Sequence, residues 1–424
     1  MNMESPVTES PQVLVTRLAE AARAAQRVVA LMSDAQKAQA LKAAASTLRD
    51  DETAILAANK RDLEAGEAKG LSGAMLDRLR LDGARIAAIA DAIDQVAVLA
   101  DPVGEVIDRC ERPNGLVLSR VRIPIGVIGI IYESRPNVTA DAAALCLRSG
   151  NAVLLRGGSE ALHSNRAIHA AMVRGLESAG VPAATIQLVP TQDREVVGAM
   201  LTAAGLIDMI VPRGGKSLVA RVQADARVPV LAHLDGICHT YVHPSADPGM
   251  ARAIANNAKM RRTGICGAME TLLLDVQFSD SVALVGELLD AGCELRGDAR
   301  ARALDPRIVA ASEEDWDTEY LDAILSVAVV DGLDTAIAHI AAHSSHHTDA
   351  IVTGEDPAAE RFLAEVDSAI VMVNASSQFA DGGEFGLGAE IGIATGRLHA
   401  RGPVALEGLT TYKWQVRGTG QTRP

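Results

Sequence analysis

The sequence has few aromatic residues and no excess of basic charge, and each shortage argues against a class of function. Aromatic residues make up 2% of the chain, which argues against the stacking platforms that bind single-stranded nucleic acids. The formal net charge of −14 argues against nucleic acids and anionic membranes as partners, because phosphate contacts need clustered Lys and Arg. Any phosphate that the protein binds should therefore belong to a small ligand in a local site.

Cysteines and long apolar runs are also scarce. The five cysteines are scattered and do not form the spacing of a disulfide framework, and no stretch of about 18 uninterrupted apolar residues is present to span a bilayer. The first ten residues, MNMESPVTES, lack the basic region and apolar core of a secretory signal. We therefore expect a soluble protein of the reducing cytoplasm.

The chain is long enough for more than one hydrophobic core. At 424 residues it should form two or three domains with a ligand-binding cleft between them. Residues 8–100 are rich in helix-forming residues with apolar positions at helical spacing, which predicts several packed helices. Residues 103–132 contain alternating and continuous apolar runs, which predict a hairpin that leads into a buried strand.

Two α/β regions follow, with a predicted junction near His233. In both regions short apolar runs alternate with helical segments, the pattern of βαβ units and a mostly parallel sheet. The tail, residues 396–424, has no helical period and is either a strand-bearing arm or a loose end. The predicted strands are NAVLL, TIQLV, LIDMIV and VPVLA in the first region, and CHTYV, ETLLLD, AILSVAVV, DAIVT and AIVMVN in the second.

Three short motifs resemble phosphate, metal or dinucleotide sites but fail in detail. In RGGKS (Arg213–Ser217), Ile210 stands where the first glycine of a phosphate loop is required. The histidines of HIAAHSSHH (His339–His347) have the i, i+4 spacing of metal ligands, but no acidic residue lies between them as in a zincin helix, and we expect no metal. GLGAEIG (Gly386–Gly392) does not follow a strand that opens a βαβ unit.

Cys266 is the cysteine whose neighbours suit catalysis. Gly264 and Gly267 flank it and leave room for a substrate, and Arg261 and Arg262 favour the thiolate electrostatically. Burial as a small core residue is the commoner role of cysteine, and the local sequence leaves both roles open. The remaining cysteines lie in or beside regular elements and are expected to be inert: Cys110, Cys146, Cys238 and Cys293.

Three longer segments carry a family resemblance that covers nearly the whole chain. They are VDGLDTAIAHIAAHSSHHTDAI, YESRPNVTADAAALCLRSGNAVLLRGGSEA and NNAKMRRTGICGAMETLLL. Together they resemble the γ-glutamyl phosphate reductase (glutamate-5-semialdehyde dehydrogenase) family, within the aldehyde dehydrogenase superfamily. The resemblance implies an aldehyde-dehydrogenase-like α/β fold, and NADPH-dependent reduction of L-glutamyl 5-phosphate to the 5-semialdehyde, the second step of proline biosynthesis from glutamate.

The resemblance also implies the catalytic residues. Cys266 matches the family's nucleophile, and Asn137 matches an asparagine whose side-chain N–H stabilises the tetrahedral oxyanion, with the backbone N–H of Cys266 as second donor. Asn137 at a strand-to-helix turn is equally an ordinary helix cap, and both roles can hold. Aldehyde-oxidising relatives carry a glutamate base where AHLDGICH has only His233 and Asp235. The missing glutamate fits a reductase whose thioester must survive, and a role for His233 as a base stays open.

The implied cofactor is NADPH. Arg156, where many relatives carry lysine, is expected to pair with the 2′-phosphate of the adenosine ribose. The glycines of two strand-to-helix turns allow close backbone approach to the cofactor, although one of these turns is equally a plain βα turn. Glu319, which by itself would pass for a surface carboxylate, matches the glutamate that holds the nicotinamide ribose. The full set of implied cofactor residues is Arg156, Gly157, Gly158, Ser159, Gly214, Gly215 and Glu319.

The domain and partner predictions follow from the same resemblance. We expect a cofactor-binding domain at 1–233 with an oligomerisation hairpin at about 109–125, a catalytic domain at 234–395 and a C-terminal arm at 396–424. A homo-oligomer and a transient complex with glutamate 5-kinase are expected, the latter because acyl phosphates are labile. Two alternatives stay open: a hydrolytic aldehyde dehydrogenase, and a noncatalytic nucleotide-binding member of the fold.

Overall fold

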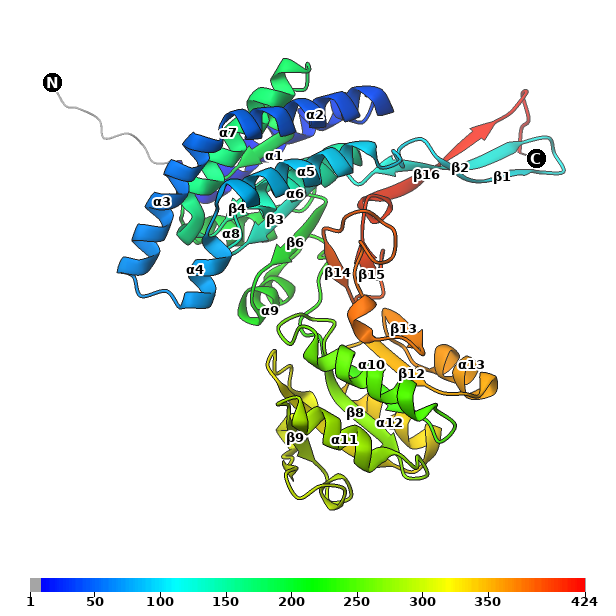
Figure 1. Cartoon of the computed structure of the whole chain (residues 1–424). Helices are drawn as coiled ribbons and strands as arrows, with labels where there is room; N and C mark the ends of the chain where they lie inside the picture. Colours follow the sequence, from blue (N-terminus) through cyan, green and yellow to red (C-terminus); the bar gives the residue numbers. More distant parts are fainter. Residues whose placement is uncertain (1–8, 424) are drawn as a thin grey trace. The chain divides into compact units, whose positions relative to one another are not determined.

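A computed structural model describes residues 9–423, which form two compact units, each with its own parallel sheet (Figure 1). The first unit comprises the chain up to Leu231, together with Leu387–Gly392 and the segment from Val404 onward. The second comprises Ala232–Gly386 and Ile393–Pro403. The predicted fold class of two α/β domains with mostly parallel sheets is confirmed. The assignment of cofactor binding to one domain and catalysis to the other stays a prediction.

The first unit has a four-stranded parallel sheet in the order β5-β4-β3-β6. Its strands are β3 (Val127–Tyr132), β4 (Ala152–Gly157), β5 (Ile186–Leu188) and β6 (Met209–Arg213). Its helices are α1 (Pro11–Val29), α2 (Asp34–Asp50), α3 (Glu52–Ala68), α4 (Gly73–Leu79), α5 (Gly83–Val98), α6 (Val138–Arg148), α7 (Leu162–Ser178), α8 (Glu195–Leu201) and α9 (Lys216–Asp225), with the short turns η1 (Ser159–Ala161) and η2 (Ala183–Thr185).

The first unit's core forms where amphipathic helices cover the sheet. Apolar residues of α1 and α8 join Val127, Ile131 and Leu154 of the sheet in one buried cluster. Helix α6 packs against β4 and also contacts α2 and α5. The helices begin where the sequence supplies caps: the side chains of Ser10 and Ser33 accept backbone N–H groups at the starts of α1 and α2.

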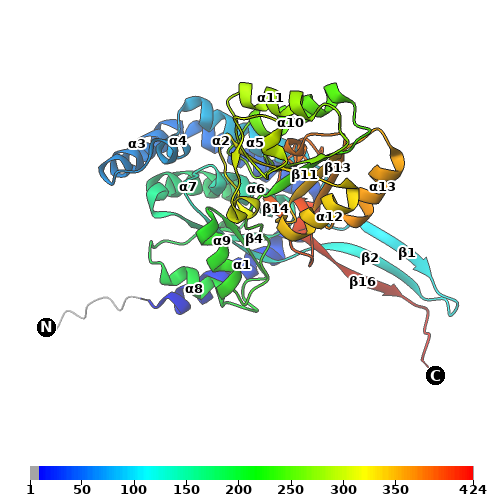
Figure 2. The ribbon, with the colours of Figure 1, turned by 90° about the horizontal axis from the view of Figure 1, so that it is seen from below.

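Three antiparallel strands form an arm that extends away from the helices of the first unit (Figures 1 and 2). They are β1 (Val106–Glu111), β2 (Val117–Pro124) and β16 (Thr410–Arg417). The predicted hairpin is therefore present. The tail, for which an arm and a loose end were both open, pairs as β16 with the whole of β2, from Thr410 opposite Pro124 to Arg417 opposite Val117.

The second unit has a seven-stranded parallel sheet in the order β10-β9-β11-β8-β7-β12-β13. Its strands are β7 (Cys238–Val242), β8 (Met269–Asp275), β9 (Glu294–Gly297), β10 (Val309–Ala310), β11 (Ile324–Val330), β12 (Thr348–Val352) and β13 (Ile370–Val373). Its helices are α10 (Pro248–Met260), α11 (Ser281–Asp290), α12 (Gly332–His343) and α13 (Asp356–Glu365), with the turns η3 (Ala301–Ala303), η4 (Glu313–Asp317) and η5 (Ser377–Phe379). The chain crosses between the units through the short pair β14 (Gly392–Ala394) and β15 (Gly402–Val404), and the turn η6 (Glu407–Leu409) precedes β16.

Helices cover both faces of the second sheet. Leu272 and Leu274 of β8 pack with residues of α10 and α11, whereas Leu273 packs with residues of α12 and α13. Since successive side chains of a strand point to opposite faces, the continuous apolar run of β8 fills two cores. This is the reason why the strand is apolar throughout rather than alternating.

One predicted strand is wrong. VPVLA was expected to be a strand of the first sheet, but only Val230 forms an isolated bridge, opposite Ile210. Pro229 has no N–H to donate to a ladder, and its carbonyl instead accepts from Ile210 N at 2.8 Å. The segment therefore follows the edge of β6 only briefly.

Among the described helices, none combines the length and the apolar character that crossing a membrane requires.

Candidate active site

Cys266 lies at the amino-terminal edge of the second sheet. It occupies the loop between α10 and β8, and three other loops that enter neighbouring strands bring further side chains to this edge. His233 precedes β7, His347 immediately precedes β12, and Glu319 precedes β11. The strands β11, β8, β7 and β12 are parallel neighbours, so residues that precede them gather at one edge.

The Cys266 loop is held by close backbone contacts. A Cβ atom on Gly236 would overlap the backbone of Cys266, so glycine is required there. The thiol of Cys238 donates to the Cys266 carbonyl at 3.1 Å, and burial raises the pKa of that thiol. Gly267 also serves packing, since an added Cβ would lie 3.1 Å from Ser377 O, whereas Gly264 is open to 3.8 Å. Only Gly264 therefore fits the expected role of leaving space beside the cysteine.

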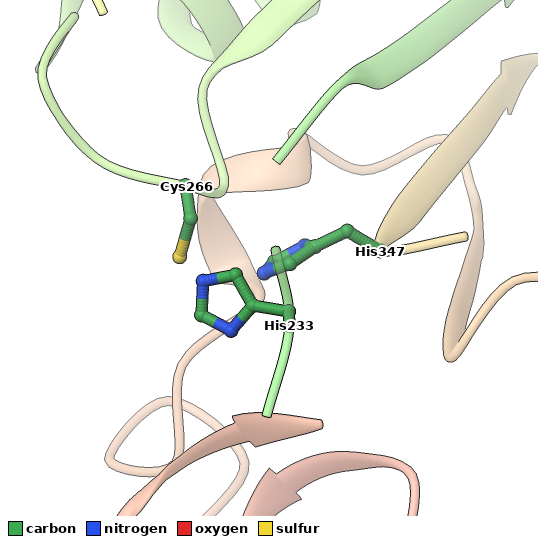
Figure 3. A group of neighbouring side chains, drawn as sticks. All are labelled: His233, Cys266 and His347. Carbon is green, nitrogen blue, oxygen red and sulfur yellow. The ribbon is translucent and has the colours of Figure 1, made fainter. Parts of the chain in front are cut away.

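Two imidazoles face the sulfur of Cys266 (Figure 3). One ring nitrogen each of His233 and His347 and the sulfur all lie within 4.8 Å of one another. His233 Nδ1 lies 2.8 Å from the carbonyl of Ile393. Because a carbonyl can only accept, Nδ1 carries a proton, and in the neutral ring Nε2 carries the lone pair. Figure 3 shows the nitrogen of His233 that is farther from its backbone turned toward the sulfur.

His347 was not predicted as a site residue. It is fully buried, and its Nδ1 lies 2.9 Å from the Thr348 hydroxyl, while Nε2 has no hydrogen-bond partner within residues 9–423. Burial, with a smaller effect of His233, lowers the pKa of His347 to about 3, so the ring is neutral at pH 7. The signal that could have identified His347 is its position directly before the apolar run TDAIV.

Glu319 and a buried ion pair support the loops around Cys266. The carboxylate of Glu319 accepts the N–H of Gly236 at 3.0 Å. Lys259 and Glu270, both fully buried, pair at 2.5 Å, and the other oxygen of Glu270 accepts from Leu321 N at 3.3 Å. Sequence reasoning missed this pair, although a lysine on the apolar face of α10 and a glutamate inside an apolar strand together indicate one. The ribose-binding role of Glu319 stays a prediction.

Asn137 in the first unit lies at the start of α6 without capping it. Its side chain makes no cap hydrogen bond; instead Nδ2 donates to Asp141 Oδ2 at 2.8 Å. Burial raises the pKa of Asp141 to about 6, and the hydrogen bond from Asn137 opposes this rise. The expected capping bond is therefore absent, and the side-chain amide is oriented by Asp141. Its role in stabilising an oxyanion stays a prediction.

The predicted 2′-phosphate residue, Arg156, lies near the carboxyl end of β4. Nη1 donates to Gly157 O at 2.9 Å and Nη2 to Gln192 O at 3.1 Å, and the buried Nε lacks a partner in the described part of the chain. Burial lowers the pKa of Arg156. A cavity of about 230 Å³ beside it includes Ser159, Glu160 and Gln192 in its lining.

The glycines at the two predicted cofactor turns differ in what they permit. A Cβ on Gly157 would overlap Asn165, and one on Gly158 would meet the side chain of Glu160, so the turn after β4 is tight, whereas a Cβ on Gly215 would meet nothing within 4 Å. Gly215 is the N-cap of α9, and its N–H donates to Glu133 Oε2 at 3.2 Å. A carboxylate thus already contacts the helix N-terminus at this predicted cofactor turn, which agrees with the preference of such termini for anions.

The i, i+4 histidines of α12 do not belong to the cluster around Cys266. The rings of His339 and His343 lie 4.6 Å apart, and His343 Nδ1 lies 2.9 Å from Asp317 Oδ1. Of the nine residues of HIAAHSSHH, the one that reaches Cys266 is His347. Cys146 and Cys293 are buried, and burial raises the pKa of both thiols, that of Cys293 to about 12.

Two α/β units and a cysteine beside a glycine-dependent loop are features of the aldehyde dehydrogenase class, and a model of the aldehyde dehydrogenase family matches residues 5–291. A γ-glutamyl phosphate reductase from Novosphingobium aromaticivorans is 74% identical over 418 residues, 99% of this chain and 98% of the relative. The crystal structure of a γ-glutamyl phosphate reductase from Thermotoga maritima superposes with a TM-score of 0.95 at 43% identity, covering 97% of this chain and 100% of that chain.

A relative in Sphingopyxis alaskensis, also a γ-glutamyl phosphate reductase, is 68% identical over 411 residues, 97% of this chain and 96% of the relative. The chain belongs to the γ-glutamyl phosphate reductases of the aldehyde dehydrogenase family. The resemblance expected from the sequence is therefore confirmed.

Proposed function

We propose that this chain reduces L-glutamyl 5-phosphate to L-glutamate 5-semialdehyde with release of phosphate, using NADPH, in the second step of proline biosynthesis from glutamate. The observation that carries the proposal is 74% identity to a γ-glutamyl phosphate reductase over 99% of the chain. The reaction is assigned to the cytoplasm, in agreement with five cysteines of which none forms a disulfide in the described structure.

Cys266 supplies the nucleophile, and His233 activates it. The proton on Nδ1 is fixed by the Ile393 carbonyl, which leaves Nε2 able to take the thiol proton. The sulfur then forms a bond to the acyl carbon, and the carbon–oxygen bond to phosphate breaks, with the electron pair leaving on phosphate. Phosphate is a good leaving group, so the step needs no strong general acid.

The tetrahedral oxyanion formed in this step needs donors that are already in position. The backbone N–H of Cys266 is one donor. The amide of Asn137 carries two N–H groups, and Asp141 accepts one of them, which leaves the second for the oxyanion. Asp141 thereby orients the amide.

The residues of the first unit fit NADPH. The buried Nε of Arg156 has no partner among the described residues, and the guanidinium suits a 2′-phosphate. Ser159 lines the adjacent cavity, and Gly214 and Gly215 lie at the start of α9, a helix N-terminus of the kind that suits a phosphate. NADPH supplies the hydride that reduces the thioester carbon. The thiohemiacetal oxyanion on Cys266 then collapses, the carbon–sulfur bond breaks, and the released thiolate regains its proton.

A hydrolytic aldehyde dehydrogenase is the second candidate, because the lone pair on His233 Nε2 could also activate water. Reduction of the acyl phosphate is favoured because AHLDGICH has no glutamate and because the similar proteins are γ-glutamyl phosphate reductases. A noncatalytic protein would form no thioester with an acyl phosphate.

A homo-oligomer and a transient complex with glutamate 5-kinase complete the proposal. The arm exposes apolar side chains, among them Trp414 and Val416 on β16, which suit pairing with a second copy. Sedimentation of the full chain tests for the homo-oligomer, and Trp414→Ser is expected to dissociate it. Protected transfer in a coupled kinase assay tests for the complex with glutamate 5-kinase.

The central test is the reverse reaction of the full chain with semialdehyde, NADP and phosphate. We expect NADPH formation that depends on phosphate or arsenate, and a loss of about 10³-fold or more in Cys266→Ser. The exposed Cys110 on β1 offers a matched control, and Cys110→Ser should keep wild-type turnover. Phosphate-independent oxidation would favour the hydrolytic candidate, and substantial turnover by Cys266→Ser would rule out the thioester.

A further inference from the structure

The three side chains at the amino edge of the second sheet have the composition of a metal-ligand set. One sulfur and two imidazole nitrogens, from Cys266, His233 and His347, lie within 4.8 Å of one another and point into the same space (Figure 3). Each comes from a loop that enters a different strand of one rigid parallel sheet. The positions are therefore set by the sheet rather than by one flexible segment.

Each imidazole turns one ring nitrogen toward this space (Figure 3). The Ile393 carbonyl holds a proton of His233 on Nδ1, so in the neutral ring Nε2 carries the lone pair that a metal would take. His347 Nδ1 contacts the Thr348 hydroxyl, and its Nε2 is buried and unpartnered within the described residues. A buried polar atom without a partner normally has an explanation, such as an ion or a ligand. Hydrogen bonds on the far nitrogens of metal-binding histidines are the usual means of orienting the rings.

The ligand chemistry selects the metal. A thiolate with two imidazoles suits Zn²⁺ and does not suit Mg²⁺ or Ca²⁺, which take oxygen ligands. With Zn–S at about 2.3 Å and Zn–N at about 2.0–2.1 Å, ligand atoms of a tetrahedral site are separated by roughly 3.3–3.6 Å. The present separations, which are at most 4.8 Å, would need to contract by up to about 1.2–1.5 Å on binding. The fourth position would hold water or a phosphate oxygen.

We propose that Cys266, His233 and His347 form a reversible Zn²⁺ site that blocks the thiol. Binding replaces the thiol proton by a sulfur–zinc bond and releases that proton to solvent. The bound sulfur is no longer available to an acyl phosphate or to an oxidant. Metal binding depends only on the three ligands, whereas inhibition also rests on the proposed nucleophilic role of Cys266.

The direct test is a Co²⁺ titration of the metal-free full chain, followed by displacement with Zn²⁺. We expect one equivalent of Co²⁺ to give the near-ultraviolet absorption of a cobalt–thiolate bond, and Zn²⁺ to abolish it. Cys266→Ser should lack the band. His347→Ala should weaken binding by more than about tenfold, since removal of outer partners alone costs 10–100-fold. His347→Gln is the second variant if His347→Ala does not fold.

The i, i+4 pair on α12 provides the matched control. His343→Ala removes one ring of the His339–His343 pair and should leave both the band and the affinity unchanged. The inference fails if no cobalt–sulfur band appears, if the His347 variants bind as tightly as the wild type, or if His343→Ala abolishes binding. The outcome is separable from the proposed function: a band without any turnover would overturn the function alone, and turnover without a band would overturn the metal site alone.

Discussion

The candidate site residues of the two units lie at opposite edges of their parallel sheets. In the first unit, Asn137 and Gly215 follow the carboxyl ends of β3 and β6, and Arg156 lies near that of β4, the usual location of ligand sites in open α/β sheets. In the second, His233, Cys266, Glu319 and His347 precede the amino ends of β7, β8, β11 and β12. The carboxyl edge offers backbone N–H groups at helix starts, which suit phosphates. The amino edge here gathers side chains that suit covalent chemistry.

After loss of the nucleophile Cys266, the largest effect is expected from a carboxyl-edge residue that is assigned a part in the chemistry. Asn137→Ala should lower kcat by about 10²–10³-fold with little change in KM, because an oxyanion donor acts in the transition state. Steady-state kinetics with acyl phosphate and NADPH measure the split. A variant that raises KM alone would assign Asn137 to substrate or cofactor binding. The carboxyl edge would then serve only binding, and the amino edge alone would serve the chemistry.

Asp141, which orients that amide, should make stability depend on pH. Its pKa is raised from 3.8 to about 6 in the folded protein, so between these values the folded state binds more protons than the unfolded state. Stability should therefore fall as pH rises from about 4 to about 6, by up to about 3 kcal/mol. Denaturation with urea at several pH values should show this fall in the wild type. Asp141→Asn should remove it, and an unchanged pH profile in the variant would assign the fall to another group.

The sequence predicted the carboxyl-edge positions better than the amino-edge cluster. Apolar runs such as NAVLL and LIDMIV identify the strands, and the glycine turns at their carboxyl ends identify Gly157 and Gly215. Cys266 and His233 were identified, but their convergence with His347 depends on the neighbour order β8-β7-β12, which a single sequence does not encode locally. The pairing of β16 with β2 was likewise left open, because exposed antiparallel strands carry a weak periodic signal and their partners lie far apart in the chain.

The amino edge should be sensitive to backbone volume beside Cys266. Gly236→Ala places a Cβ against the Cys266 backbone, and we expect a loss of about 1–3 kcal/mol in stability together with reduced turnover. Gly264→Ala is the matched control, because its added Cβ would meet no atom closer than 3.8 Å. Thermal melting of both variants measures the difference. Equal melting temperatures would show that the Cys266 loop yields more easily than these contacts indicate.

The smallest effect should appear at the cofactor residues, where binding is shared among many contacts. Arg156→Ala should raise the KM for NADPH by about tenfold, equivalent to about 1.4 kcal/mol, while the KM for NADH changes little, because only NADPH carries the 2′-phosphate that the guanidinium would pair with. Arg156 also donates to Gly157 O and Gln192 O, so a purely structural role would weaken both cofactors alike. Arg156→Lys keeps the charge and should recover part of the preference. The ratio of the KM for NADPH to the KM for NADH therefore decides whether Arg156 binds the 2′-phosphate or only stabilises the turn after β4.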